Sequence, residues 1–156
     1  VIPAMPAKTK AVGVFVNETT DNIIALSKNA GFSVVQLHGE EGQTEIEALQ
    51  AAGLQVIKAI SVGSAKDLDQ TDKPDFYLFD TKKGAQVGGT GEHFDWSLLT
   101  QYKLDIPYIL AGGLQSGDVE KVKDFPGLYA LDFNSKLEIR PGFKDVEQVK
   151  ELVKQL

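Results

Sequence analysis

The sequence predicts an α/β fold in which parallel strands form a barrel, and three observations favour this fold. Short apolar segments alternate with amphipathic segments, which is typical of strands that crossover helices bury on both faces. The alternation repeats six times in 156 residues, about 26 residues per unit. Polar or glycine residues follow nearly every predicted strand, and a barrel collects such strand ends on one face.

Each predicted strand is a short apolar run, and each predicted helix carries apolar residues about one turn apart. Polar residues that can cap the first helix precede it at Asn17 and at 19–21, and Gly31 and Gly53 end the first two helices. Residues 134–144 are predicted to be a loop. In chain order the elements are strand 11–16, helix 22–30, strand 33–37, helix 44–52, strand 55–60, short helix 64–68, strand 76–79, a helix from about Asp95, strand 108–111, helix 116–123, strand 128–133 and helix 145–155.

The number of units leaves two folds open. A closed barrel has eight units in about 200 to 250 residues, so we expect residues 1–156 to be one barrel domain that lacks two N-terminal units. The irregular start at Val1 agrees with an upstream segment that is missing. The alternative is an open, doubly wound sheet with its ligand at a switch point of strand order. The polar strand ends favour the barrel.

Composition excludes several classes of function. Sixteen Lys and Arg against 22 Asp and Glu give a net charge of −6, which disfavours nucleic acid and anionic membranes as partners. The absence of cysteine excludes disulfides, thiolate metal sites and cysteine nucleophiles from these residues, and two distant histidines give a metal site little support. No apolar run approaches the roughly 20 residues of a membrane span, so we expect a cytoplasmic protein.

Two pairs of residues after consecutive strands predict a phosphate site. Gly112 and Gly113 follow strand 108–111, and the lack of a Cβ lets backbone N–H groups approach an anion closely. Asn134 and Ser135 follow the next strand, which matches the barrel phosphate site in the loops after the last two strands. The predicted ligand is a phosphorylated small molecule, although the two glycines alone also fit a tight turn.

Other polar residues at strand ends could move protons or position a ligand. Asp80 and Asp132 each lie beside apolar residues that disfavour the charged form, so either could deliver a proton, although such carboxylates often only cap a turn. His38 ends the second strand, where a lone histidine more often positions a ligand than acts as a base. Gly89 and Gly91 belong to a glycine-rich loop that fits a lid or ligand cradle, with a plain mobile loop as the alternative.

Several short motifs at the strand ends occur together in a specific order. They are Val12–Asn17, Val35–Glu40, Lys58–Ile60, Leu78–Thr81, Gly88–Gly91 with Phe94–Trp96, Leu110–Leu114, Asp132–Ser135, Glu138, Pro141–Gly142 and Lys144–Asp145. From about Lys10 onward, this combination resembles phosphoribosylanthranilate isomerase of tryptophan biosynthesis. The resemblance implies a (βα)8 TIM barrel that converts N-(5'-phosphoribosyl)anthranilate to 1-(2-carboxyphenylamino)-1-deoxyribulose 5-phosphate by an Amadori rearrangement without a cofactor.

The resemblance also implies roles for individual residues. Asp80 matches the general acid that protonates the furanose ring oxygen, and Asp132 matches a residue near the anthranilate amine. His38 falls where the family lines its pocket. The residues that match the phosphate-binding loops are Gly112, Gly113, Asn134 and Ser135.

Some residues of the family pattern are missing. The family's general base is a cysteine on its first strand, and its second unit supplies an arginine; neither motif occurs here, and strand 11–16 corresponds to the family's third strand. We therefore expect these 156 residues alone to be inactive, and their unpaired strand edges to favour self-association. Lys136 also stands where the family usually has glycine.

Two other functions stay open. An indoleglycerol-phosphate synthase shares the phosphate loops but needs a catalytic lysine, for which Lys58 is the candidate. A non-catalytic phosphosugar-binding barrel fragment would keep the phosphate site and lack the base. Asp80 and Thr81 fit the isomerase better than the synthase.

Overall fold

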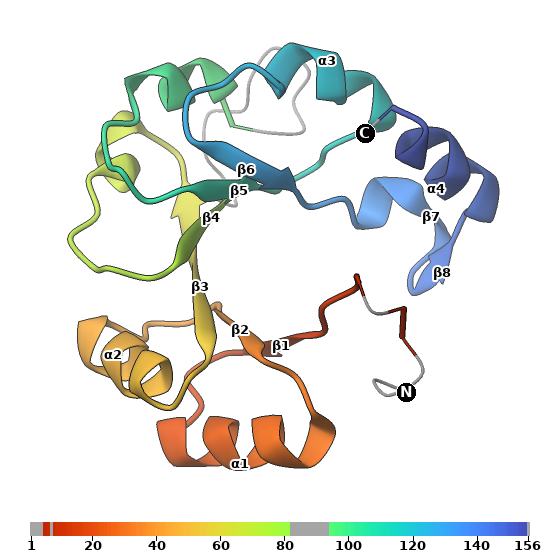
Figure 1. The fold of residues 1–156 in the computed structure, drawn as a ribbon. Coiled ribbons are helices and arrows are strands. Elements are labelled where there is room, and N and C mark those ends of the chain that lie inside the picture. The colour runs from red at the N-terminus through yellow and green to blue at the C-terminus, as the bar shows by residue number, and fades with distance from the viewer. Residues whose placement is uncertain (1–4, 7, 82–93, 156) are drawn as a thin grey trace. The chain divides into compact units, whose positions relative to one another are not determined.

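The computed structural model describes residues 5–6, 8–81 and 94–155, and all six predicted strands are present (Figure 1). The helices after β3 and β4 are 3-10 helices. In chain order the elements are β1 (Val12–Phe15), α1 (Thr20–Ala30), β2 (Val34–Leu37), α2 (Gln43–Ala51), β3 (Gln55–Val62), η2 (Ala65–Leu68), β4 (Phe76–Thr81), η3 (Trp96–Gln101), β5 (Tyr108–Leu110), η4 (Ser116–Asp118), α3 (Val119–Val122), β6 (Leu128–Leu131), η5 (Ser135–Leu137), β7 (Glu138–Arg140), β8 (Phe143–Lys144) and α4 (Val146–Val153).

The order of the strands distinguishes between the two predicted folds. The first six strands are hydrogen-bonded in chain order, β1-β2-β3-β4-β5-β6, without a reversal. The pairs β1–β2, β2–β3 and β5–β6 are parallel. A doubly wound sheet reverses its strand order at a switch point, whereas a barrel runs in sequence, so the barrel-type α/β fold is confirmed and the doubly wound alternative is wrong.

The chain packs as two compact units, and the first has its own apolar core. Unit 1 comprises Val1–Ile60 with Gln70–Leu78. Its helix α1 begins after Thr19, whose Oγ1 accepts a hydrogen bond from the N–H of Asn22 at 3.4 Å, and it ends at Gly31 with a φ of 83°. Both helix boundaries therefore follow from capping chemistry. The buried core residues of unit 1 are Ile23, Val35, Leu37, Ile46, Leu49, Leu54 and Val56.

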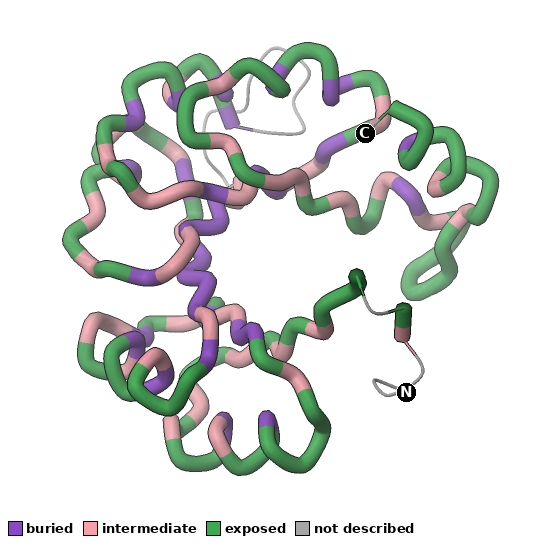
Figure 2. The backbone as a smooth tube through the Cα atoms, viewed as in Figure 1, coloured by how far each residue is buried: buried purple, intermediate pink, exposed green. Residues whose placement is uncertain are grey.

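Unit 2 comprises Ser61–Asp69 with Phe79–Leu156 and carries most of the predicted site residues. Figure 2 shows buried backbone along β3 and β4, in agreement with their runs of buried side chains. The rings of Phe79, Tyr102 and Tyr108 lie 5.1 to 5.4 Å apart between centroids. Such tilted and edge-on contacts stabilise a core beyond the apolar area they bury.

The predicted loop 134–144 is wrong, because this segment contains η5 and the two-stranded antiparallel hairpin β7–β8. Each strand is too short to show a period of two in the sequence, which explains the error. Gly142 turns the hairpin with a φ of 78°, and the guanidinium of Arg140 lies 4.3 Å from the ring centroid of Phe143. In the described part of the chain, no helix is long and apolar enough to span a membrane.

We predict that Tyr108→Phe stabilises the protein. Tyr108 is fully buried, and its hydroxyl has no hydrogen-bond partner among the residues that the structure describes. Removing this hydroxyl should raise the free energy of unfolding by about 1 kcal/mol, because an unpaired buried polar group costs its desolvation energy. Urea unfolding measures the change.

The contrasting variant is Tyr102→Phe. The hydroxyl of Tyr102 donates to the carbonyl oxygen of Ile106 at 2.6 Å, so its loss should lower the free energy of unfolding by about 1 kcal/mol. Equal losses in both variants would contradict the assignment of Tyr108 as an unpaired group.

Candidate active site

The ends of β4, β5 and β6 bring the candidate acid and the candidate phosphate loops to one edge of unit 2. The N–H of Ala111 donates to the carbonyl oxygen of Phe79 at 2.8 Å. The N–H of Asp132 donates to the carbonyl oxygen of Leu110, also at 2.8 Å. These bonds align the carboxyl ends of neighbouring parallel strands, so the residues that follow them share one edge, as the sequence predicted.

The carboxyl group of Asp80 lies against the backbone of Gly112. Its Oδ1 accepts a hydrogen bond from the N–H of Thr81 at 2.7 Å, and the residue is half-buried. A Cβ built on Gly112 would lie 2.6 Å from Asp80 Oδ1 and 2.5 Å from Thr81 Oγ1. Gly112 also has a φ of 86°, which side chains rarely adopt. Only glycine fits there, and its missing side chain leaves room for the carboxyl of Asp80, the candidate acid, beside the predicted phosphate loop.

The two predicted phosphate loops have different backbone structures. Gly112 and Gly113 are consecutive residues in the left-handed region, with φ values of 86° and 77°. Asn134 and Ser135 are exposed, and Ser135 begins the 3-10 helix η5. Exposed donors next to a flexible glycine backbone can approach an anion without a steric barrier.

One lysine fixes the second of these loops. Lys144 Nζ donates to the backbone oxygen of Asn134 at 2.9 Å, to its Oδ1 at 2.5 Å and to Oε1 of Glu138 at 2.8 Å. The hydrogen bond from Lys144 holds the pKa of the Glu138 carboxyl below its usual range. The lysine therefore keeps a charged partner over the ordinary pH range.

The second predicted carboxylate differs from the first in its surroundings. Asp132 is exposed, whereas Asp80 is half-buried. The apolar neighbours of Asp132 in the sequence therefore do not bury it, and the expected burial of this carboxylate is wrong. Of the two carboxylates, Asp80 is the more shielded from water.

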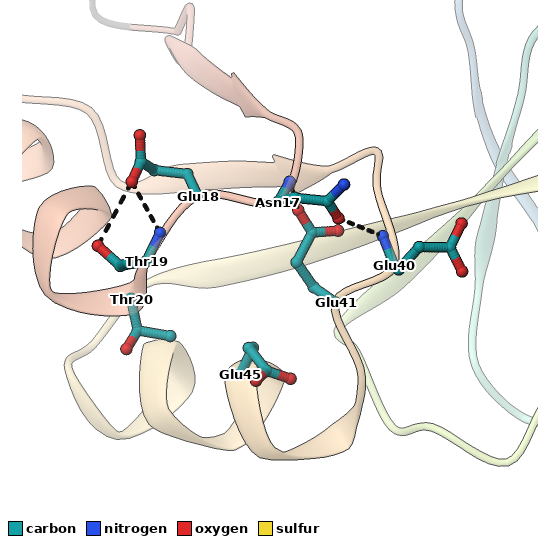
Figure 3. Close-up of a pocket in the computed structure, with 7 residues that line it drawn as sticks. All are labelled: Asn17, Glu18, Thr19, Thr20, Glu40, Glu41 and Glu45. Atoms are coloured by element: carbon teal, nitrogen blue, oxygen red, sulfur yellow. Dashed lines mark hydrogen bonds between the residues drawn. The ribbon is translucent and has the colours of Figure 1, made fainter.

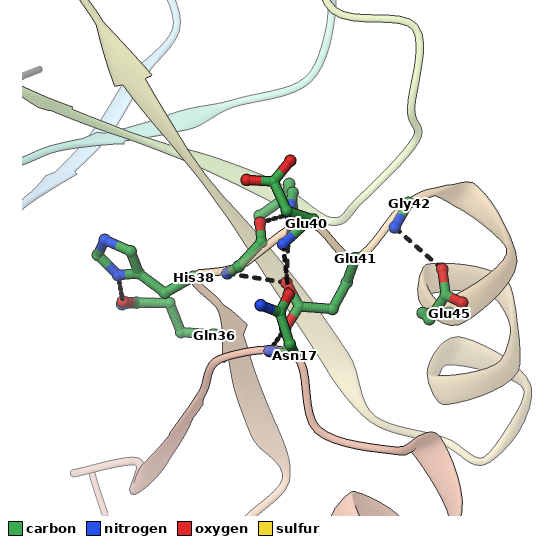
Figure 4. A network of polar contacts seen from close by, with 9 residues as sticks. Asn17, Gln36, His38, Glu40, Glu41, Gly42 and Glu45 are labelled. Carbon is green, nitrogen blue, oxygen red and sulfur yellow. Dashed lines mark hydrogen bonds and ion pairs between the residues drawn. The ribbon is translucent and has the colours of Figure 1, made fainter.

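His38 lies in unit 1, at the end of β2. Its backbone N–H donates to the carbonyl oxygen of Phe15 at 2.8 Å. Its ring Nδ1 is 3.0 Å from Oε1 of Gln36 (Figure 4). With this oxygen as acceptor, Nδ1 donates the hydrogen bond, and Gln36 thereby orients the exposed ring.

A buried ion pair between Glu41 and Lys58 connects the ends of β1 and β2 with the middle of β3, and Figure 4 shows Glu41 close to Asn17. Oε1 of Glu41 accepts the N–H of Asn17 at 2.6 Å, and Oε2 accepts the N–H of Gly39 at 2.9 Å. Lys58 Nζ lies 3.3 Å from Glu41 Oε2 and donates to the carbonyl oxygen of Gly39 at 2.6 Å. Burial acts to raise the pKa of Glu41, but these N–H donors and the Lys58 charge together hold it below its usual range.

This pair removes the main support for the synthase alternative. The ammonium of Lys58 is buried and bound to Gly39 and Glu41, so it serves the structure of unit 1. Sequence analysis did not single out Glu41, because a glutamate after Gly39 and Glu40 looks like part of a solvated turn. Two features of the sequence could have indicated a buried role for Glu41: the adjacent glycine and the lysine on an otherwise apolar strand.

A cavity of about 430 Å³ lies next to this pair in unit 1 (Figure 3). Four of its lining residues are glutamates, which disfavour the binding of a phosphate group by charge repulsion. The predicted phosphate site therefore belongs to unit 2 and not to this cavity. Its lining residues are Asn17, Glu18, Thr19, Thr20, Glu40, Glu41 and Glu45.

Two further sequence predictions concern the glycine-rich ligand cradle and a metal site. Gly89 and Gly91, the predicted ligand cradle, lie outside the described residues. Over residues 5–6, 8–81 and 94–155, no group of three histidine or acidic side chains could hold a metal ion.

Comparison with known proteins identifies the family. Residues 3–155 match the family model described as N-(5'phosphoribosyl)anthranilate (PRA) isomerase. The chain belongs to this family. An isomerase of this name from Parabacteroides distasonis is 36% identical over 153 residues, which cover 94% of this chain and 69% of the relative.

Solved PRA isomerases support the same assignment. The Thermotoga maritima enzyme superposes with a TM-score of 0.80 and 35% identity, covering 96% of this chain and 74% of that one. A second structure, a PRA isomerase in complex with reduced 1-(o-carboxyphenylamino)-1-deoxyribulose 5-phosphate, gives a TM-score of 0.78 at 29% identity, covering 97% and 73%. The isomerase family and its barrel-type fold, both expected from the strand-end motifs, are thus confirmed.

We predict that Gly112→Ala is far more damaging than Gly142→Ala. Both glycines have left-handed φ values, but a Cβ at Gly142 has nothing within 4 Å. Gly142→Ala should lose about 1 kcal/mol from backbone strain alone, and Gly112→Ala about 3 kcal/mol because overpacking is added. Urea unfolding of both variants tests this, and equal losses would refute the close contact with Asp80 and Thr81.

We also predict that Glu41→Gln changes how stability depends on pH. The pKa of Glu41 is lowered from 4.5 in the folded protein, so its contribution is present above that pH and is lost as the pH falls further. The variant should lose about 3 kcal/mol near pH 7, where Lys58 is left unpaired, and this deficit should shrink below about pH 4.5. Urea unfolding at several pH values measures it.

The control is Glu47→Gln on the exposed face of α2. Its difference from the parent protein should be small at every pH, because exposed charges contribute little. A Glu41→Gln deficit that is the same at pH 7 and pH 3.5 would exclude a role for the Glu41 charge.

Proposed function

We propose that this chain carries the acid half of the PRA isomerase reaction and that Asp80 is the general acid. Family membership gives the reaction class, and the contact between the Asp80 carboxyl and Gly112 is the observation that carries the assignment of the acid. This contact joins a proton donor to the loop that the resemblance assigns to phosphate. A substrate whose phosphate is bound at that loop would have its sugar ring within reach of the acid.

The proposed chemistry balances without a cofactor. Asp80 gives its proton to the furanose ring oxygen, the C1–O bond breaks, and the nitrogen lone pair forms a C1=N double bond. A general base then removes the C2 proton; the C2–H electron pair forms a C1=C2 double bond, and the C1=N pair returns to the nitrogen, which gives an enol. The enol hydroxyl loses its proton as C1 gains one, so that C2 becomes the ketone. The proton held by the base restores the Asp80 carboxyl, so that no proton is gained or lost overall. The position of this carboxyl beside the predicted phosphate loop suits the first step, because a general acid must lie within hydrogen-bond reach of the oxygen that it protonates.

The other predicted residues have binding roles in this proposal. Gly112, Gly113, Asn134 and Ser135 would hold the phosphate, which their glycine backbone and exposed polar groups support. Asp132 would lie near the anthranilate amine, as the resemblance implies. The pocket-lining role that the resemblance gives His38, in unit 1, stays a separate prediction. The expectation of a cytoplasmic protein also stays part of this proposal, because the family's reaction belongs to amino-acid biosynthesis.

We further propose that the 156 residues do not complete the catalytic pair by themselves. The family resemblance assigns the base to a cysteine, and the sequence contains none. Phosphosugar binding without turnover is therefore the expected behaviour of these residues alone. This coincides with the binding-module alternative, so only an experiment that restores the base separates a module from an incomplete enzyme.

The test compares ligand binding with turnover. Calorimetric titration with reduced 1-(o-carboxyphenylamino)-1-deoxyribulose 5-phosphate should show binding, while the assay of N-(5'-phosphoribosyl)anthranilate should show no turnover by protein whose mass is verified as 16.9 kDa. Turnover at the rate of a complete isomerase would refute the proposal about the base. Absence of binding would refute the phosphosugar site.

We predict that Asp80→Asn removes turnover without removing binding. The variant is made in a chimaera that places the family's first two βα units, with their cysteine, ahead of this chain. Loss of a general acid should lower kcat by about 100-fold or more. The matched control is Asp105→Asn, at an exposed loop position, which should leave kcat unchanged.

Two results would overturn the role of Asp80. A chimaera whose turnover is the same before and after the Asp80→Asn substitution excludes this residue as the acid. A chimaera that binds the reduced product but never turns over substrate favours the binding-module function instead.

A further inference from the structure

We propose that Lys144 is a positioning residue that orients the side-chain amide of Asn134 toward the substrate phosphate. This inference rests on the proposed phosphate site and adds a residue to it that touches no ligand. It also assigns the hairpin β7–β8, which the sequence did not predict, the task of holding that lysine.

Lys144 has no donor left for a phosphate oxygen. A lysine ammonium carries three N–H donors and no acceptor. Three oxygen atoms lie within 2.9 Å of its Nζ: the backbone oxygen of Asn134, Oδ1 of Asn134 and Oε1 of Glu138. Each donor therefore has an acceptor, and the effect of Lys144 on a ligand must pass through Asn134.

The contact with Lys144 determines which end of the Asn134 amide is free. Oδ1 faces the ammonium, because two donors cannot face each other. Nδ2, with its two N–H groups, is then directed away from the lysine. An anion needs donors, so this orientation presents the useful end, while the flipped amide would present an oxygen and repel the phosphate.

The lysine is itself held in place by its surroundings. Glu138 and Lys144 are paired across the hairpin, and the neighbouring Asp145 N–H donates to the carbonyl oxygen of Leu137 at 2.8 Å. The carboxylate of Asp145 caps α4 by accepting the N–H groups of Glu147 and Gln148. The lysine thus extends from a backbone that is fixed on both sides.

Charge balance also indicates positioning in preference to attraction. The ammonium of Lys144 is paired with the carboxylate of Glu138, so the pair adds no net charge beside the loop. A lysine that attracts phosphate by charge would need to be free of such a partner. Replacement of Lys144 should therefore lower the affinity only for a ligand that carries the phosphate, and only in a protein that has Asn134.

The experiment measures affinity for the reduced product 1-(o-carboxyphenylamino)-1-deoxyribulose 5-phosphate and for its dephosphorylated counterpart. Lys144→Met should weaken binding of the phosphorylated ligand by about 10-fold and leave the dephosphorylated ligand unchanged, because one charge-assisted hydrogen-bond network is lost. Lys144→Arg should retain most of the affinity. Lys150→Met, which removes an exposed lysine paired with Glu147, is the matched control and should change neither affinity.

A double-mutant cycle separates positioning from direct contact. In the Asn134→Ala background, Lys144→Met should have almost no further effect, since the group it orients is gone. An undiminished 10-fold loss in that background would show that Lys144 acts on the phosphate directly and would overturn the proposal. Equal weakening of both ligands would also overturn it, because the loss would then come from the fold.

A ligand-free measurement keeps this inference distinct from the proposed function. The two side-chain amide protons of Asn134 should shift in the NMR spectrum of Lys144→Met and stay in place in Lys150→Met. A parent protein that shows the Lys144-dependent amide signal but no preference for the phosphorylated ligand refutes the phosphate site and with it the positioning role. Unchanged amide signals refute the Lys144–Asn134 contact itself.

Discussion

Parallel pairing of neighbouring strands is the constraint on which the candidate site depends. Backbone hydrogen bonds from Ala111 to Phe79 and from Asp132 to Leu110 bring the carboxyl ends of β4, β5 and β6 to one edge. At Gly112, a Cβ would meet the Asp80 carboxyl and Thr81. The glycine is therefore required by the local packing at this strand end, whether or not a ligand binds there, and the carboxyl of the candidate acid can lie beside the predicted phosphate loop because a side chain is missing.

The two units stabilise their strand ends by different physical means. Unit 1 uses a buried carboxylate, Glu41, that accepts backbone N–H groups from the ends of β1 and β2 and pairs with Lys58 on β3. Such a pair contributes to specificity of arrangement, because either partner alone would be an unpaired buried charge. Unit 2 instead uses glycines and an exposed lysine, Lys144, at the surface. An accessible edge suits a ligand, whereas the buried pair of unit 1 stabilises the strand ends that surround it.

Periodicity and capping predicted the elements because both act over a few residues. Thr19 and Gly31 define α1, and the apolar runs define the six strands of the sheet. The sequence predicted neither the hairpin β7–β8, whose strands have three and two residues, nor the exposure of Asp132. The exposure of a side chain and the pairing of very short strands both depend on which residues pack around them in three dimensions. The partners of Glu41 lie as many as 24 positions away, so no local pattern could reveal them.

A chain with a net charge of −6 can still bind a phosphate group, because the candidate site relies on neutral donors. The groups proposed to line it are the backbone of Gly112 and Gly113, the amide of Asn134 and the hydroxyl of Ser135. Lys144, which contacts Asn134, is paired with Glu138, so its charge cannot substitute for correct geometry. Donors that are fixed in place discriminate between ligands by leaving unpaired polar groups when the phosphate is absent. Orientation of the Asn134 amide by Lys144 therefore governs specificity in a way that the chain's overall charge does not.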